Sequence, residues 1–94
     1  MYILHYTPNF KRRIYKLKRN NRSLEKKIIK TLEDLNSNPF NIRIKTHKVI
    51  TEYGDTFSSR VNKDIRILWI FKKSEQIIIL LSIGGHEGSK KVYR

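Results

Sequence analysis

The sequence contains no cysteine, only two prolines and four glycines, and few acidic residues. Without cysteine the chain can form no disulfide, no thiolate metal site and no cysteine nucleophile. No run of apolar residues is longer than five, as in Ile77–Leu81, whereas a membrane span needs about 18. No basic and apolar leader with a small-residue cleavage site opens the sequence. These absences favour a cytoplasmic protein with no membrane partner.

Positive charge is what the sequence has in excess. Its 94 residues include 21 Lys and Arg against 8 Asp and Glu, a formal net charge of +13. A chain of this length is expected to form one domain, residues 1–94, with one modest core. Because such a charge excess repels itself, it indicates a polyanionic partner. Nucleic acid is the first candidate, ahead of an acidic protein or an anionic membrane surface.

The first half of the sequence predicts a strand followed by two amphipathic helices. The strand is expected at Tyr2–Tyr6, and Thr7 with Pro8 makes a helix start, with Thr as N-cap and Pro at the first helical position. Ser23 is expected to cap the second helix, and the stretch from Asn36 to Pro39 to end it. The apolar residues recur at helical spacing, at Phe10, Ile14 and Leu17 and then at Leu24, Ile28, Leu32 and Leu35.

The second half changes to the period-two alternation typical of strands. Four strands are expected, at Lys48–Thr51, Phe57–Asn62, Ile65–Lys72 and Gln76–Ile83, with a turn around Gly54. The predicted fold is therefore α+β, with an N-terminal strand and a helix hairpin packed on one face of a small antiparallel β-sheet.

Strand register places two arginines side by side. If the apolar sides of two strands share a face, Val61 opposes Ile65, which makes residues 62–64 a three-residue turn and sets Arg60 opposite Arg66. Directly opposed arginines repel each other unless an anion lies between them, and the guanidinium group suits a phosphate.

The next hairpin is expected to pair Ile67 with Leu81, and hence Arg66 with Ser82. The Gly84-Gly85 pair then brings His86 beside the two arginines, at one end of the face turned away from the helices.

This set of residues suits transesterification of RNA without a metal or other cofactor. A base takes the 2′-hydroxyl proton, arginines stabilise the phosphate charge, and an acid protonates the 5′-oxygen. His86 and His47 are the titratable candidates. The alternative is that either histidine is merely structural and that Arg60 and Arg66 are solvated sheet charges. Neither the histidines nor the carboxylates show the spacing of a metal site.

The segment from Phe57 to Trp69, with Arg60-Val61-Asn62 and Ile65-Arg66-Ile67, resembles the central hairpin of the RelE/ParE superfamily of bacterial toxins, particularly its RelE, YoeB and YafQ branches. Ile83-Gly84-Gly85-His86-Glu87, followed by Val92-Tyr93, resembles their C-terminal segment. The resemblance implies a RelE-like toxin fold whose concave sheet face cuts mRNA in the ribosome, and a partner antitoxin, acidic and partly disordered, that neutralises it.

By position, the resemblance implies that Arg66 grips the scissile phosphate and that His86 transfers a proton. Arg60, His47 and Tyr93 also fall near positions that these branches use, although seven residues separate Tyr93 from His86. The lysine-rich base positions of RelE itself are not matched, which favours histidine-led chemistry. The basic residues expected to contact RNA are Lys45, Lys48, Lys63, Lys90 and Lys91.

Two other functions compete with an mRNA endonuclease. A ParE-like toxin would inhibit DNA gyrase by binding, without RNA cleavage, and would not need the histidines. A non-catalytic RNA-binding domain would present aromatic residues on its sheet, whereas the face expected here carries arginine and serine.

Overall fold

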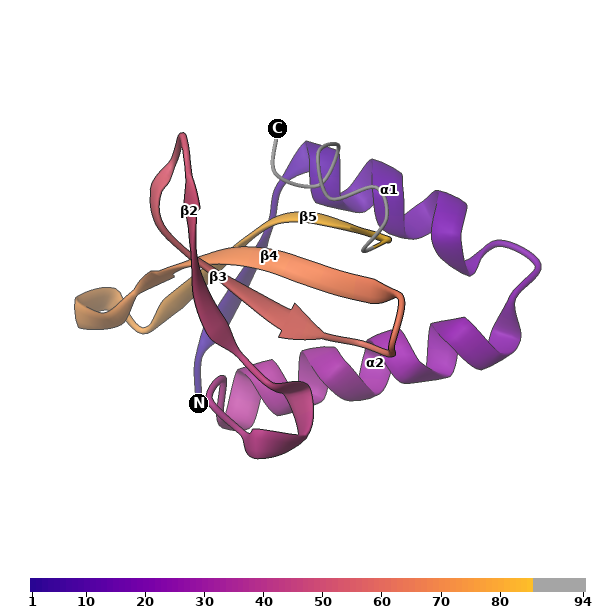
Figure 1. The fold of residues 1–94 in the computed structure, drawn as a ribbon, viewed down its shortest axis with the longest axis horizontal. Coiled ribbons are helices and arrows are strands. Elements are labelled where there is room, and N and C mark those ends of the chain that lie inside the picture. Colours follow the sequence, from indigo (N-terminus) through magenta and orange to yellow (C-terminus); the bar gives the residue numbers. More distant parts are fainter. Residues whose placement is uncertain (86–94) are drawn as a thin grey trace.

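The computed structural model describes residues 1–85 and shows two helices packed against a five-stranded sheet (Figure 1). In chain order the elements are β1 (Ile3–Tyr6), α1 (Pro8–Lys18), α2 (Arg22–Ser37), the 3-10 turn η1 (Ile42–Ile44), β2 (His47–Thr51), β3 (Gly54–Arg60), β4 (Ile65–Lys72), the 3-10 turn η2 (Lys73–Glu75) and β5 (Ile77–Gly85). The predicted α+β class and order of elements are confirmed.

Local sequence signals fix the ends of the helices. The Thr7 hydroxyl accepts a hydrogen bond from the Phe10 N–H (3.2 Å), with Pro8 at the first helical position, as predicted. The prediction that Ser23 caps the second helix is wrong. Asn21 caps it, with its side-chain oxygen accepting from the Leu24 N–H at 3.1 Å. Asn is as good a cap as Ser, and its earlier position adds helical hydrogen bonds.

The strands lie in the order β1-β5-β4-β3-β2, so the first and second strands of the chain form the two edges. β1 pairs with β5 in parallel, and every other pair is antiparallel. The core lies between the sheet and the helices. It contains Phe10 of α1, Ile28 and Leu35 of α2, and Ile67 and Trp69 of β4, each no more than 1% exposed.

A β-bulge in β5 changes the register expected for the last hairpin. Leu68 pairs with Ser82 and Trp69 with Leu80, so that Leu81 is left without a partner on β4. The predicted pairing of Ile67 with Leu81 is therefore wrong. Past the bulge, Ile67 pairs with Ile83 and Arg66 with Gly84 rather than Ser82. The bulge lets Leu80 and Ile83, three residues apart, both reach the core.

The helix start at Thr7 holds this bulge in place. The Thr7 hydroxyl donates to the Leu80 carbonyl at 2.7 Å, and the Asn9 amide donates to the Leu81 carbonyl at 2.9 Å. The backbone oxygens at the irregularity thus find partners in α1. Across residues 1–85, neither helix is both long and apolar enough to cross a bilayer.

Candidate functional site

The two arginines singled out by the register lie opposite each other. Arg60, the last residue of β3, pairs with Arg66 of β4, and Arg66 pairs on its other side with Gly84 of β5. The Val61 N–H donates to the Ile65 carbonyl at 2.9 Å, which closes the predicted turn. Both arginines are half-buried. The sheet thus presents two guanidinium-bearing residues in one row, which ends on the buried Gly84 of β5.

The turn that carries this row is fixed by Asn62. Its side-chain oxygen accepts hydrogen bonds from the N–H groups of Asp64 (2.8 Å) and Ile65 (2.7 Å). Its main-chain carbonyl oxygen accepts a hydrogen bond from Arg60 Nε at 3.1 Å. Such an Asx turn holds the backbone without tertiary help. Asn62 therefore both shapes the turn and orients the Arg60 guanidinium.

His47 shares a sheet face with both arginines. It is the first residue of β2 and pairs with Ser58, which lies two residues before Arg60 on the same side of β3. Diagonal neighbours across an antiparallel pair are about 7–8 Å apart, within reach of long side chains. The His47 ring is exposed, and its Nδ1 lies 3.3 Å from the Lys45 carbonyl. In the tautomer whose Nδ1 donates there, Nε2 is left as a proton acceptor.

The face turned away from the helices is not open along its whole length. Ser58, Leu68 and Ser82 form a row across three strands and are each at most 3% exposed. The Oγ atoms of both serines are buried and have no hydrogen-bond partner among residues 1–85. Unpaired buried hydroxyls are uncommon in folded proteins. Both serines lie one row away from the arginine pair, and Ser58 is the direct neighbour of His47.

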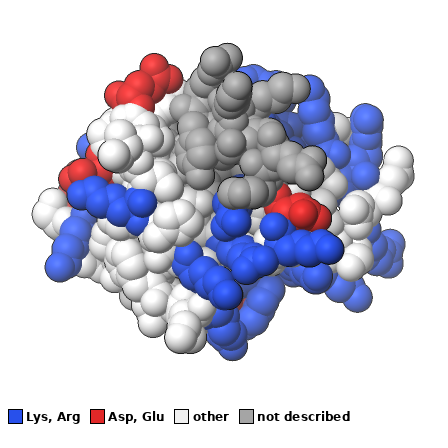
Figure 2. Space-filling model, viewed as in Figure 1, with Lys and Arg blue, Asp and Glu red and all other residues white. Residues whose placement is uncertain are grey.

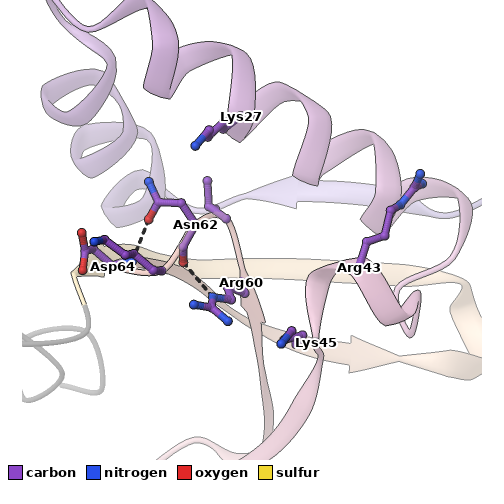
Figure 3. A pocket seen from close by; sticks show the side chains of 8 residues that line it. Lys27, Arg43, Lys45, Arg60, Asn62 and Asp64 are labelled. Carbon is purple, nitrogen blue, oxygen red and sulfur yellow. Dashed lines mark hydrogen bonds between the residues drawn. The ribbon is translucent and has the colours of Figure 1, made fainter.

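A basic groove borders the arginine row, between α2, η1 and the β3–β4 turn (Figure 3). Its volume is about 530 Å³. Five cationic side chains line it against one acidic side chain, and the full lining is Lys27, Arg43, Lys45, Arg60, Val61, Asn62, Lys63 and Asp64. Figure 2 shows Lys and Arg side chains gathered over this half of the molecule. The arrangement favours an anion.

The structure brings together some of the predicted RNA contacts and separates others. Lys45 and Lys63 line the basic groove with Arg60. Lys48 pairs with Phe57, which places it on the opposite face from His47, and its Nζ lies 3.1 Å from Asp55 Oδ1. The other predicted site residues, His86, Tyr93, Lys90 and Lys91, lie outside the described residues.

Two groove residues were not predicted from the sequence. Lys27 precedes Ile28, a buried residue of α2, so it lies at the border of the apolar stripe. This position was the signal available in the sequence. Arg43 reaches back to α2, where its guanidinium lies 2.9 Å from the buried Asp34 carboxylate. No sequence signal links these two elements. Among residues 1–85, no group of three or more metal-ligating side chains forms a cluster.

No protein-family model matches the sequence, and no curated protein matches it. Solved structures do match. A metal-bound toxin from Helicobacter pylori superposes with a TM-score of 0.77 at 21% identity, over 94% of this chain and 98% of that one. YafQ in the DinJ–YafQ complex from E. coli gives 0.75 at 16% identity, over 94% and 97%. The YoeB dimer from Staphylococcus aureus gives 0.73 at 20% identity, over 90% and 97%. The chain has the fold of the RelE/ParE toxins, and the predicted resemblance is confirmed at that level.

Proposed function

We propose that this chain is the toxin of a type II toxin–antitoxin system and acts as an endoribonuclease that cuts mRNA on the ribosome. The observation that carries the proposal is the Arg60–Arg66 pair, with His47 on the same face of the sheet. The planar guanidinium group matches the geometry of a phosphate, and two such groups in one row can contact the same phosphate. The fold shared with YafQ and YoeB agrees with this assignment.

The reaction is transesterification at one RNA phosphate. A base removes the 2′-hydroxyl proton, and the 2′-oxygen attacks the adjacent phosphorus. The bond to the 5′-oxygen then breaks, and an acid gives that oxygen a proton, which leaves a 2′,3′-cyclic phosphate and a free 5′-hydroxyl. Arg60 and Arg66 stabilise the added negative charge on the phosphorane. His47 and His86 supply the base and the acid, and Tyr93 is a further candidate for proton transfer.

The test compares single variants expressed in cells that are translating. RNA ends should map within translated codons and carry the cyclic phosphate or its hydrolysis product. Arg66→Gln, His47→Gln and His86→Ala should each slow cutting by about 10²-fold or more, the scale of one catalytic group. His5→Gln is the matched control, because His5 is exposed on β1, which two intervening strands, β5 and β4, separate from β3.

Two results would contradict the proposal. Full cutting by His47→Gln and His86→Ala together would remove histidine chemistry from the mechanism. Inhibition of gyrase supercoiling by the unaltered chain, with mRNA left intact, would favour a ParE-like toxin that acts by binding alone.

The proposed partner is an acidic, partly disordered antitoxin. The net charge of +13 favours an acidic segment that folds on binding, and the YafQ structure was solved in a complex with DinJ. Ribosome and mRNA complete the proposed set of partners.

A further inference from the structure

The basic groove holds more positive charge than its own structure neutralises. Arg43 is paired with Asp34 (2.9 Å), which also lies 3.7 Å from Lys30 Nζ. No ion pair joins Lys27, Lys45 or Lys63 to any described residue. Asp64 is the one acidic side chain in the lining. Three lysines and Arg60 therefore face a common space with little compensation.

The clustering of these lysines does not stabilise the fold. Like charges brought together repel, and at low ionic strength that repulsion lowers stability. Each lysine comes from a different element: Lys27 from α2, Lys45 from the end of η1 and Lys63 from the β3–β4 turn. Figure 3 shows the Lys27 and Lys45 side chains on opposite sides of the space that Arg60 enters. Binding of an anionic ligand would compensate the repulsion among these lysines and explains why they lie together.

The backbone beneath two of these cations is held firmly. Lys45 has left-handed backbone angles (φ 46°, ψ 47°), and its N–H donates to the Ile42 carbonyl at 3.3 Å. The next residue, Thr46, donates its hydroxyl to the Pro39 carbonyl. Lys63 lies within the Asx turn made by Asn62. A charge held on a fixed backbone binds its ligand with less ordering of the chain.

We propose that the groove binds a second backbone phosphate of the RNA, one that is not cut, with Lys27, Lys45 and Lys63 as its ligands. This inference rests on the proposed function and extends it. Arg60 belongs both to the groove lining and to the pair with Arg66, so the groove begins where the cutting site ends. The RNA then leaves the cutting site over the β3–β4 turn toward α2, and Lys48 on the far face of β2 takes no part.

Binding of a short single-stranded RNA with methylated 2′-hydroxyls tests the groove, because such an RNA cannot be cut by this chemistry. Lys27→Gln is compared with Lys26→Gln. Both residues are exposed neighbours on α2 and both changes remove one charge, but only Lys27 lines the groove. We expect Lys27→Gln to weaken binding by about 5–10-fold, the scale of one ordinary hydrogen bond at an exposed side chain. It should also reduce the slope of log affinity against log salt by about 0.7. Lys63→Gln should behave in the same way.

Equal effects of Lys26→Gln and Lys27→Gln on affinity and slope would overturn the inference, because they would show a diffuse positive field. It would also be overturned if Lys27→Gln left RNA binding intact and weakened binding of a polyglutamate peptide, which would assign the groove to an acidic protein. Circular dichroism verifies that each variant folds. Since the probe cannot be cut, loss of cleavage in Arg66→Gln and loss of binding in Lys27→Gln report on the two proposals separately.

Discussion

Two adjacent serines on β3 occupy opposite faces of the sheet and have opposite hydrogen-bonding states. Ser59, on the helix side, accepts from Trp69 Nε1 at 2.8 Å and shares a 2.6 Å hydrogen bond with the Thr46 hydroxyl. Since Thr46 donates to the Pro39 carbonyl, Ser59 must donate to Thr46. The result is a chain of hydrogen bonds from the core tryptophan to the segment before β2. The Oγ of Ser58 has no hydrogen-bond partner within the described part of the chain, so Ser58 has no such role there.

This difference predicts different stabilities for two equally small changes. Ser59→Ala should lower the free energy of unfolding by about 1–3 kcal/mol, because it leaves the buried Trp69 N–H without an acceptor. Ser58→Ala should leave stability unchanged or raise it slightly, because the lost hydroxyl had no partner to lose. Urea unfolding followed by tryptophan fluorescence measures both. Equal destabilisation by the two changes would mean that Ser58 has a structural hydrogen bond.

Lys45 combines a strained backbone with a proposed role in binding, and two substitutions separate these properties. A left-handed residue with a side chain costs about 1–2 kcal/mol, which glycine avoids at some cost in unfolded-state entropy. Lys45→Gly should therefore be more stable than Lys45→Gln by about 0.5–1 kcal/mol. Both should lose RNA affinity equally, because both lack the amine.

Thermal unfolding and RNA titration of the two Lys45 variants provide the measurements. If Lys45→Gly bound RNA as well as the unaltered chain, the amine would have no part in the groove. If it were less stable than Lys45→Gln, the left-handed backbone would not be a source of strain.

The elements that sequence predicts well are those with local causes. Thr7 as N-cap and Pro8 at the first helical position start α1. Gly54 forms its turn with a φ of 88°, a value that glycine readily adopts. The register that opposes Arg60 and Arg66 follows from alternation within a single hairpin. The boundaries of β3 and β5 differ by a few residues from those expected. The alternation of apolar and polar residues, from which strand ends are predicted, is lost where the side chains are polar or very small.

The features that sequence missed depend on contacts between distant segments. The run Ile77–Leu81 is apolar at every position, so it has no alternation from which a bulge could be recognised. The bulge is instead stabilised by Thr7 and Asn9 from the other end of the chain. The groove likewise needs α2 and η1 to meet the β3–β4 turn, and the Arg43–Asp34 contact joins the two former elements.

Net charge acts on the molecule as a whole, because its dimensions are comparable to the range of electrostatic repulsion. The chain measures 37 × 27 × 25 Å, and the Debye length falls from about 30 Å at 0.01 M salt to about 8 Å at 0.15 M. At low salt, repulsion among the positive charges therefore extends through most of the protein. At physiological salt only neighbouring charges repel. We expect stability to rise with sodium chloride over this range, on the order of 1 kcal/mol or about 4–8 °C in Tm.

Inorganic phosphate distinguishes this general screening from occupancy of the groove. At equal ionic strength, phosphate should raise Tm above the value in sodium chloride, because a ligand that binds the folded state alone adds RT ln(1 + [L]/Kd). The extra increase should shrink in Lys27→Gln and persist in Lys26→Gln, while the response to sodium chloride stays the same in both. If phosphate and chloride stabilise all three proteins equally, the groove holds no phosphate, and the charge excess acts only as a uniform field around the chain.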